Sequence, residues 1–134
     1  MDVKPVRRGG VLLGTLVFLV APAFTQGPQI PLLDRLEAGQ WEVRGIEDAL
    51  IASICLGDAH LLVQPRHGSA NCSRNLVSSD QDSATVRYTC PGSGFGQTTI
   101  RLETPRLAQI DSQGLSQGVP FALRGEARRI GPCR

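Results

Sequence analysis

Short runs in which apolar and polar residues alternate recur along most of the chain. Within residues 40–46, Trp41 and Val43 share one face and charged residues lie on the other. A period of two predicts a half-buried β-strand. Further strands are predicted over 50–56, 72–79, 83–90, 98–104, 108–112 and 119–130. Because these short strands are closely spaced, the pattern favours an antiparallel meander.

Two short helical segments interrupt this pattern. Proline at its first position, leucines on one side and Gly39 at its end predict a helix over 31–38. Asp58 is expected to cap a second short helix, which runs to about Gln64 and stops before a proline. The expected fold is therefore mainly β: an antiparallel meander forming a curved sheet or a small sandwich, with one or two short helices.

The N-terminal segment has the pattern of an export signal. Basic residues precede an apolar run over 11–20, and Ala21-Pro22-Ala23 supplies small residues at a spacing that signal peptidase accepts. This predicts a signal peptide over 1–23 and a single β-rich exported domain over 24–134. The run is shorter than the roughly 20 residues of a transmembrane helix. We therefore expect a periplasmic or secreted protein without stable membrane insertion after signal cleavage.

The charge distribution argues against two classes of partner. The formal net charge is +2, and residues 1–23 account for all of it, with three basic residues and one acidic. Residues 24–134 are therefore balanced and carry no basic stripe. Nucleic acid and anionic membrane are not expected partners.

Four cysteines remain after the predicted signal peptide. They are Cys55, Cys72, Cys90 and Cys133. An even number of cysteines in a small exported domain predicts two disulfides, for which three connectivities exist.

A predicted hairpin chooses among these connectivities. Its strands flank residues 80–82, and when Ser79 lies opposite Ser83, Cys72 falls opposite Cys90. In this register the apolar side chains of both strands, except Val77, gather on one face, whereas a slip of one residue would separate them. The positions of the cysteines and the alternation of apolar residues therefore agree on the register. The predicted disulfides are Cys72–Cys90 and, by remainder, Cys55–Cys133.

Several short sequences, taken in order, resemble a known family. They are Gly39-Gln40-Trp41-Glu42-Val43, Ile54-Cys55-Leu56, Asn71-Cys72, Tyr88-Thr89-Cys90, Gly94-Phe95-Gly96 and residues 127–133. With the four cysteines, they resemble the exported bacterial proteins classified as domain of unknown function 3617. The resemblance covers nearly all of residues 24–134 and implies a small β-rich envelope protein with paired cysteines. It supplies no catalytic residues, and the Met-rich stretch that many members carry after the Trp-Glu motif is absent here.

One motif matches a hydrolase signature. Gly114-Leu115-Ser116-Gln117-Gly118 fits G-x-S-x-G, the nucleophile elbow, which requires a helix after the serine and a later histidine. Here the following segment is strand-like, and both His60 and His67 precede Ser116. The pattern therefore favours a hairpin turn, and a small hydrolase is the weakest of the alternatives.

The glycine-rich run Gly92-Ser93-Gly94-Phe95-Gly96 does not match a nucleotide-binding loop. It lacks the spacing and the following helix of a dinucleotide fingerprint, and it lacks the Gly-Lys-Ser/Thr of a Walker loop. We interpret residues 91–96 as a connection between strands, with Phe95 either packed or exposed for contact.

The titratable residues do not define a site by their spacing. Asp58, His60 and His67 are unevenly spaced for a metal, and Glu42 with Asp48 or Glu126 supplies carboxylates whose separation the sequence does not fix. We therefore expect no metal, no cofactor and no catalytic residue.

These observations predict a non-catalytic binding or envelope-associated module rather than an enzyme. Its candidate contact residues are Trp41, Tyr88 and Phe95. A covered concave face would predict a small apolar ligand, whereas an exposed apolar patch or a free edge strand would predict a periplasmic protein partner. The alternative is an inhibitor of a periplasmic enzyme that presents the disulfide-braced loop 91–97.

Overall fold

The computed structural model describes residues 29–134, so the signal peptide predicted over 1–23 lies outside the described residues. Along the described part, a short 3-10 helix precedes each of the first three strands, and four further strands follow. The elements are η1 (Leu33–Arg35), β1 (Gly39–Arg44), η2 (Ile46–Asp48), β2 (Leu50–Leu56), η3 (Ala59–Val63), β3 (Ser73–Ser79), β4 (Ser83–Cys90), β5 (Gly94–Thr104), β6 (Leu107–Ser116) and β7 (Val119–Gly131). Each of the predicted strands is present, and the mainly β fold class is confirmed.

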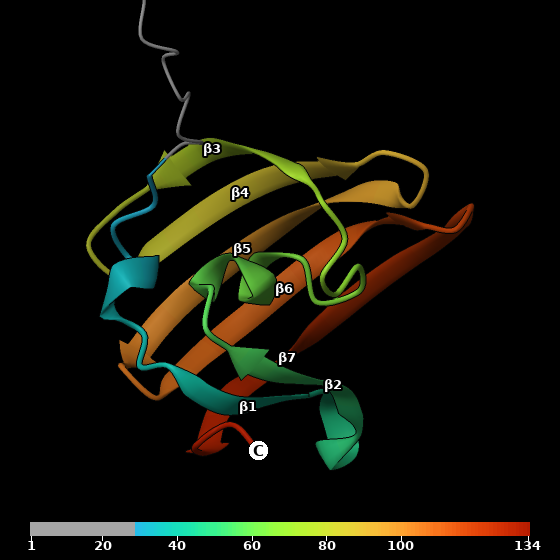
Figure 1. Cartoon of the computed structure of the whole chain (residues 1–134). Helices are drawn as coiled ribbons and strands as arrows, with labels where there is room; N and C mark the ends of the chain where they lie inside the picture. Colours follow the sequence, from blue (N-terminus) through green and yellow to red (C-terminus); the bar gives the residue numbers. More distant parts are fainter. Residues whose placement is uncertain (1–28) are drawn as a thin grey trace, which may run out of the picture.

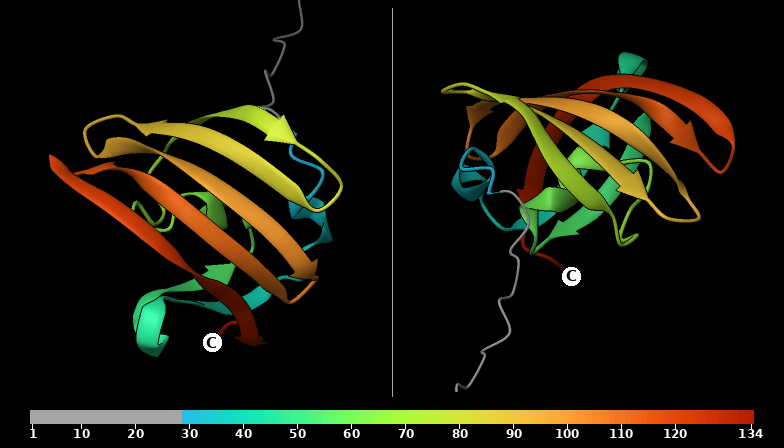
Figure 2. Two further views of the ribbon diagram at one scale, coloured as in Figure 1. Left: turned by 180° about the vertical axis from the view of Figure 1, so that it is seen from behind. Right: turned by 90° about the horizontal axis from the view of Figure 1, so that it is seen from above.

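All these strands belong to one antiparallel sheet with the order β2-β1-β7-β6-β5-β4-β3 (Figure 1). From β3 to β7 the chain forms a meander in which each strand pairs with the next. The β1–β2 hairpin then pairs with β7, which leaves β2 and β3 as the two edges. The sheet is strongly curved and has a concave and a convex face (Figure 2).

The apolar core lies on the concave face. Alternating residues of the strands point into it, as the period of two predicts. The fully enclosed members include Trp41, Val43, Val86, Ile100, Ile110 and Ala127. The opposite face carries mostly charged and polar side chains, which form ion pairs such as Arg124 with Asp111.

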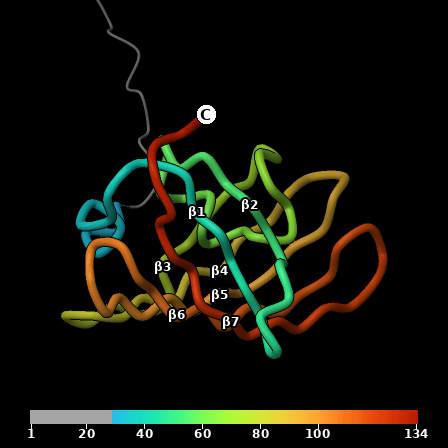
Figure 3. The backbone as a smooth tube through the Cα atoms, turned by 90° about the horizontal axis from the view of Figure 1, so that it is seen from below, coloured from blue at the N-terminus to red at the C-terminus, as the bar shows by residue number. Residues whose placement is uncertain are grey.

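Residues 57–72, the connection from β2 to β3, cross the concave face (Figures 1 and 3). Leu62 and Val63 of η3 are fully buried there. Gln64 is also fully buried, and its Nε2 donates hydrogen bonds to the carbonyl oxygens of Gly68 at 2.7 Å and Ala70 at 2.9 Å. We call residues 57–72 the crossing segment. It forms the second layer of the fold.

The disulfides hold both ends of the crossing segment. Cys55 lies in β2 just before the segment and is bonded to Cys133, which follows β7. Cys72 ends the segment and is bonded to Cys90 at the end of β4. Both predicted pairings are confirmed.

The β3–β4 hairpin keeps the predicted register over only part of its length. Leu76 lies opposite Val86 as expected, but a bulge at Val77 shifts the pairing, so Ser79 faces Ala84 rather than Ser83. The sequence pattern does not show this extra residue because residues 76–79 of β3 are all exposed, so no buried face fixes the register there. A bulge on an edge strand makes it a poorer template for strand addition.

Two further boundaries differ from the expectation. Gly94–Gly96 is part of β5, so the connection predicted over 91–96 is a tight turn at 91–93. The loop 91–97 of the inhibitor alternative is therefore mostly a paired strand. The helix predicted over 31–38 is a single 3-10 turn, η1, whose Leu33 is buried.

Removing either disulfide should destabilise the fold, and the disulfide that closes the longer loop should cost more. The pairs span sequence separations of 78 and 18 residues. Loop-closure entropy then gives losses of about 4.5 kcal/mol for C55A/C133A and about 3 kcal/mol for C72A/C90A. Urea unfolding of the oxidised protein and of each double variant measures both losses. A greater loss from C72A/C90A would contradict the loop-entropy account.

Candidate functional site

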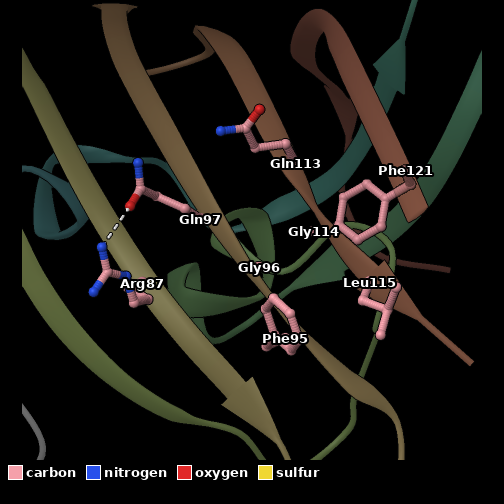
Figure 4. Close-up of a pocket in the computed structure, with 8 residues that line it drawn as sticks. All are labelled: Arg87, Phe95, Gly96, Gln97, Gln113, Gly114, Leu115 and Phe121. Carbon is pink, nitrogen blue, oxygen red and sulfur yellow. Dashed lines mark hydrogen bonds between the residues drawn. The ribbon is translucent and has the colours of Figure 1, made fainter. Parts of the chain in front are cut away.

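A hollow of about 460 Å³ lies on the convex face, over β4, β5, β6 and β7 (Figure 4). It is lined by Arg87, Phe95, Gly96, Gln97, Gln113, Gly114, Leu115 and Phe121. We call it the Phe95 hollow. Phe95 and Leu115 lie opposite each other on neighbouring strands, and so do Gln97 and Gln113. The hollow thus has an apolar side and an amide side.

Two glycines that face each other across β5 and β6 make the floor. Gly96 pairs with Gly114 between the Phe95–Leu115 pair and the Gln97–Gln113 pair, and a side chain at position 96 would point to the concave face, where Tyr88 lies. A Cβ on Gly96 would lie 2.5 Å from the Tyr88 hydroxyl oxygen, and one on Gly114 would overlap the Phe95 carbonyl oxygen. Glycine is needed at both positions because the backbone and Tyr88 approach too closely for any side chain.

Beneath this floor, Tyr88 and His67 connect the sheet to the crossing segment. The Tyr88 hydroxyl and His67 Nδ1 are 3.2 Å apart, and the tautomer of the ring decides which donates. The His67 ring also contacts Phe121, with 5.9 Å between centroids. Burial raises the pKa of Tyr88, and hydrogen bonds with Ser112 and Thr98 offset part of this rise. The neutral phenol is therefore the form that this environment favours.

The charge of the hollow comes from Arg87. Its guanidinium donates a hydrogen bond to Gln97 Oε1 at 3.3 Å. Among residues 29–134, no carboxylate lies within ion-pair distance of Arg87. Most other arginines of this face are paired, as Arg124 is with Asp111 and Arg128 is with Glu126. Arg87 is therefore available to a negatively charged group.

The three predicted contact residues lie in different environments. Phe95 borders the hollow and is 51% exposed. Tyr88 is fully buried directly below Gly96, so it supports the hollow from within. Trp41 is fully buried in the core, and its Nε1 donates to the Glu37 carbonyl oxygen at 2.9 Å.

The G-x-S-x-G motif forms the β6–β7 hairpin turn. Ser116 pairs with Val119, and Gln117 and Gly118 between them both have positive φ angles, of 51° and 79°. This is the pattern of a two-residue hairpin turn. No helix follows Ser116, so the backbone does not have the form of a nucleophile elbow.

The titratable residues fall into two separate groups. The first is Asp58 and His60, whose Oδ1 and Nδ1 atoms are 2.7 Å apart. His67, which the sequence suggested as a third member, contacts Tyr88 instead. In the part of the chain that the structure describes, no three His, Cys, Asp or Glu side chains are grouped as metal ligands. The second group borders a hollow of about 430 Å³ and consists of Glu42, Arg44, Asp48, Glu126 and Arg128. Its carboxylates are paired, Glu42 with Arg44 at 2.7 Å and Glu126 with Arg128 at 2.7 Å.

Sequence reasoning did not identify most of the hollow. Arg87, Gln97, Gln113, Leu115 and Phe121 come from four strands that meet only in the folded sheet. One signal was available: Gly94-Phe95-Gly96 and Gly114-Leu115-Ser116 each place a large apolar residue between small ones. Pairing these two segments would have brought Phe95 and Leu115 together.

The fold and site define a small, disulfide-stabilised antiparallel β module. Comparisons with protein-family models, with curated proteins and with solved structures give no match to this chain. The resemblance to domain of unknown function 3617 therefore stays a prediction. No helix within residues 29–134 is long and apolar enough to cross a membrane.

Gly96→Ala should destabilise the protein, because its Cβ would be forced against the Tyr88 ring. Overpacking of this kind costs about 1–3 kcal/mol. Gly57→Ala is the matched control, since no atom lies within 4 Å of its added Cβ. Urea unfolding measures both, and similar stabilities of the two variants would show that Tyr88 does not require glycine at position 96.

Asp58 should contribute stability only above acidic pH. Partial burial raises its pKa, but hydrogen bonds from the His60 backbone and ring and the charges of His60 and Arg74 outweigh this, so its pKa is lowered. Its contribution is therefore present above about pH 4 and is lost as pH falls through the lowered pKa. Asp58→Asn keeps the helix cap and removes the charge, so its stability deficit should shrink between pH 7 and pH 3. A deficit that stays constant in urea unfolding at both pH values would contradict this assignment.

Proposed function

We propose that the protein is a non-catalytic periplasmic binding module, and that the Phe95 hollow receives an apolar or aromatic group that carries a negative charge. The observation that carries this proposal is that a half-exposed Phe95 and Arg87 line the same hollow. A phenyl ring exposed beside a cation without a carboxylate partner in residues 29–134 presents two complementary contacts. Such a combination binds aromatic anions and acidic apolar side chains.

The filled concave face supports placing the ligand on the convex side. Leu62, Val63 and Gln64 of the crossing segment are fully buried against the inner face of the sheet. The protein therefore uses its own side chains where a carrier for a small apolar ligand would keep a cavity. On the convex face, by contrast, Phe95, Leu115 and Arg87 border a hollow that a side chain or small molecule can enter.

Two features support a location outside the cytoplasm. Both disulfides are of the kind that forms and persists in oxidising compartments. The predicted signal peptide and the resemblance to an exported bacterial family favour the periplasm. The paired carboxylates and the turn at Ser116 support a binding role rather than catalysis.

Binding of 1-anilinonaphthalene-8-sulfonate tests the proposal, because this probe joins an aromatic system to an anionic group. We expect saturable binding by the oxidised protein with a rise in fluorescence. Phe95→Ser and Arg87→Gln should each weaken it about tenfold, the effect of one good aromatic or charged contact.

Val77→Ser is the matched control, since Val77 is 52% exposed on the edge strand β3 and does not line the hollow. It should leave the probe affinity unchanged. Far-ultraviolet circular dichroism confirms that each variant is folded. If Val77→Ser weakens binding as much as Phe95→Ser does, the probe reports general apolar surface and the proposed function is wrong.

A further inference from the structure

The turn of the β1–β2 hairpin is strained and exposed. Glu47 and Asp48 both have positive φ angles, 58° and 62°. Hairpin turns with two such residues strongly prefer Asn-Gly or Asp-Gly, because most side chains are disfavoured there. Ile46, just before them, is 83% exposed. A strained turn that presents an apolar side chain to solvent indicates a contact element rather than a structural one.

The chemistry of this turn complements that of the Phe95 hollow. Arg44 holds Asp48 through its carbonyl oxygen at 3.0 Å and its carboxylate at 3.4 Å. Glu47 forms no ion pair with any of residues 29–134. The turn thus offers an exposed isoleucine beside an available carboxylate, and the hollow offers apolar walls beside an available guanidinium.

We propose that the occupant of the Phe95 hollow is the β1–β2 turn of a second copy of this chain. Ile46 enters between Phe95 and Leu115 of the partner copy, and Glu47 pairs with the Arg87 of that copy. The inference rests on the proposed function because it uses the same hollow. Charge complementarity favours this occupant: Glu47 and Arg87 carry opposite charges, and neither forms an ion pair with any of residues 29–134.

The topology allows the contact to close on itself. β1 ends at the same end of the sheet at which β5 and β7 begin, because neighbouring strands are antiparallel. The β1–β2 turn therefore lies toward the same end of the sheet as the starts of β5 and β7 (Figure 1), which are near the residues that line the hollow. A twofold axis at this end lets each copy insert its turn into the other. Such an isologous contact gives a closed dimer rather than an open chain.

Sedimentation velocity of the oxidised full chain across a concentration series tests the dimer. Glu47→Arg and Arg87→Glu should each raise the dimer dissociation constant about tenfold or more, since each places like charges together. The double variant E47R/R87E restores the pair and should return the constant to near its original value. Arg101→Glu is the matched control, because it reverses a charge elsewhere on β5, where Arg101 pairs with Glu103.

A second variant separates loss of contact from loss of fold. E47N/D48G supplies the residues that the turn geometry prefers, so it should be at least as stable as the original chain. It should nevertheless be monomeric, because it lacks the Glu47 carboxylate. A chain that is monomeric at all concentrations, a dimer indifferent to these substitutions, or oligomers that keep growing would each overturn the proposal. Retained binding of the naphthalene sulfonate probe to a monomeric chain would then leave the proposed function standing.

Discussion

A single curved sheet must have its apolar concave face covered, and the rest of this structure depends on how that cover is held. The chain has no second sheet and no long helix within residues 29–134. Its cover is the crossing segment, 57–72, which contributes Leu62 and Val63 to the core. Such a short irregular segment gains little from its own hydrogen bonds. Disulfides at Cys55 and Cys72 bracket it, and the buried Gln64 side chain donates hydrogen bonds to its Gly68 and Ala70 carbonyl oxygens.

The same arrangement shapes the convex face. His67 of the crossing segment contacts Tyr88, whose ring occupies the space that a side chain at position 96 would need. Gly96 therefore has two roles. Its lack of a side chain makes room for the Tyr88 ring on the concave face, and its backbone forms part of the floor of the Phe95 hollow on the convex face. Phe121 takes part in both the hollow and the inner packing, since it lines the Phe95 hollow and its ring contacts that of His67. A binding surface built on a rigid sheet keeps its geometry without a ligand, which lowers the entropy cost of association.

The features that could be predicted from the sequence are those that depend on residues close together in the chain. The hairpin that joins Cys72 to Cys90 was predictable because alternation and cysteine positions agree, and the cap at Asp58 follows from its own neighbours. The bulge at Val77 was not, because nothing on an exposed edge fixes its register. The glycines on either side of Phe95 resemble a loop in sequence, and only close contacts across the fold explain them as strand residues: Gly94 lies against the Leu115 backbone and Gly96 against Tyr88. The Phe95 hollow depends on sheet order, which brings four strands together and which alternation does not encode.

Hydrogen exchange followed by mass spectrometry tests most directly whether the pinned crossing segment supports the hollow. The comparison is between the oxidised protein and C72A/C90A under native conditions. If the account is right, faster exchange in the variant extends from the crossing segment into residues 94–97 and 113–115, because His67 no longer holds Tyr88 beneath the glycine pair. Faster exchange confined to the residues next to the missing disulfide, with the hollow fully protected, would contradict it.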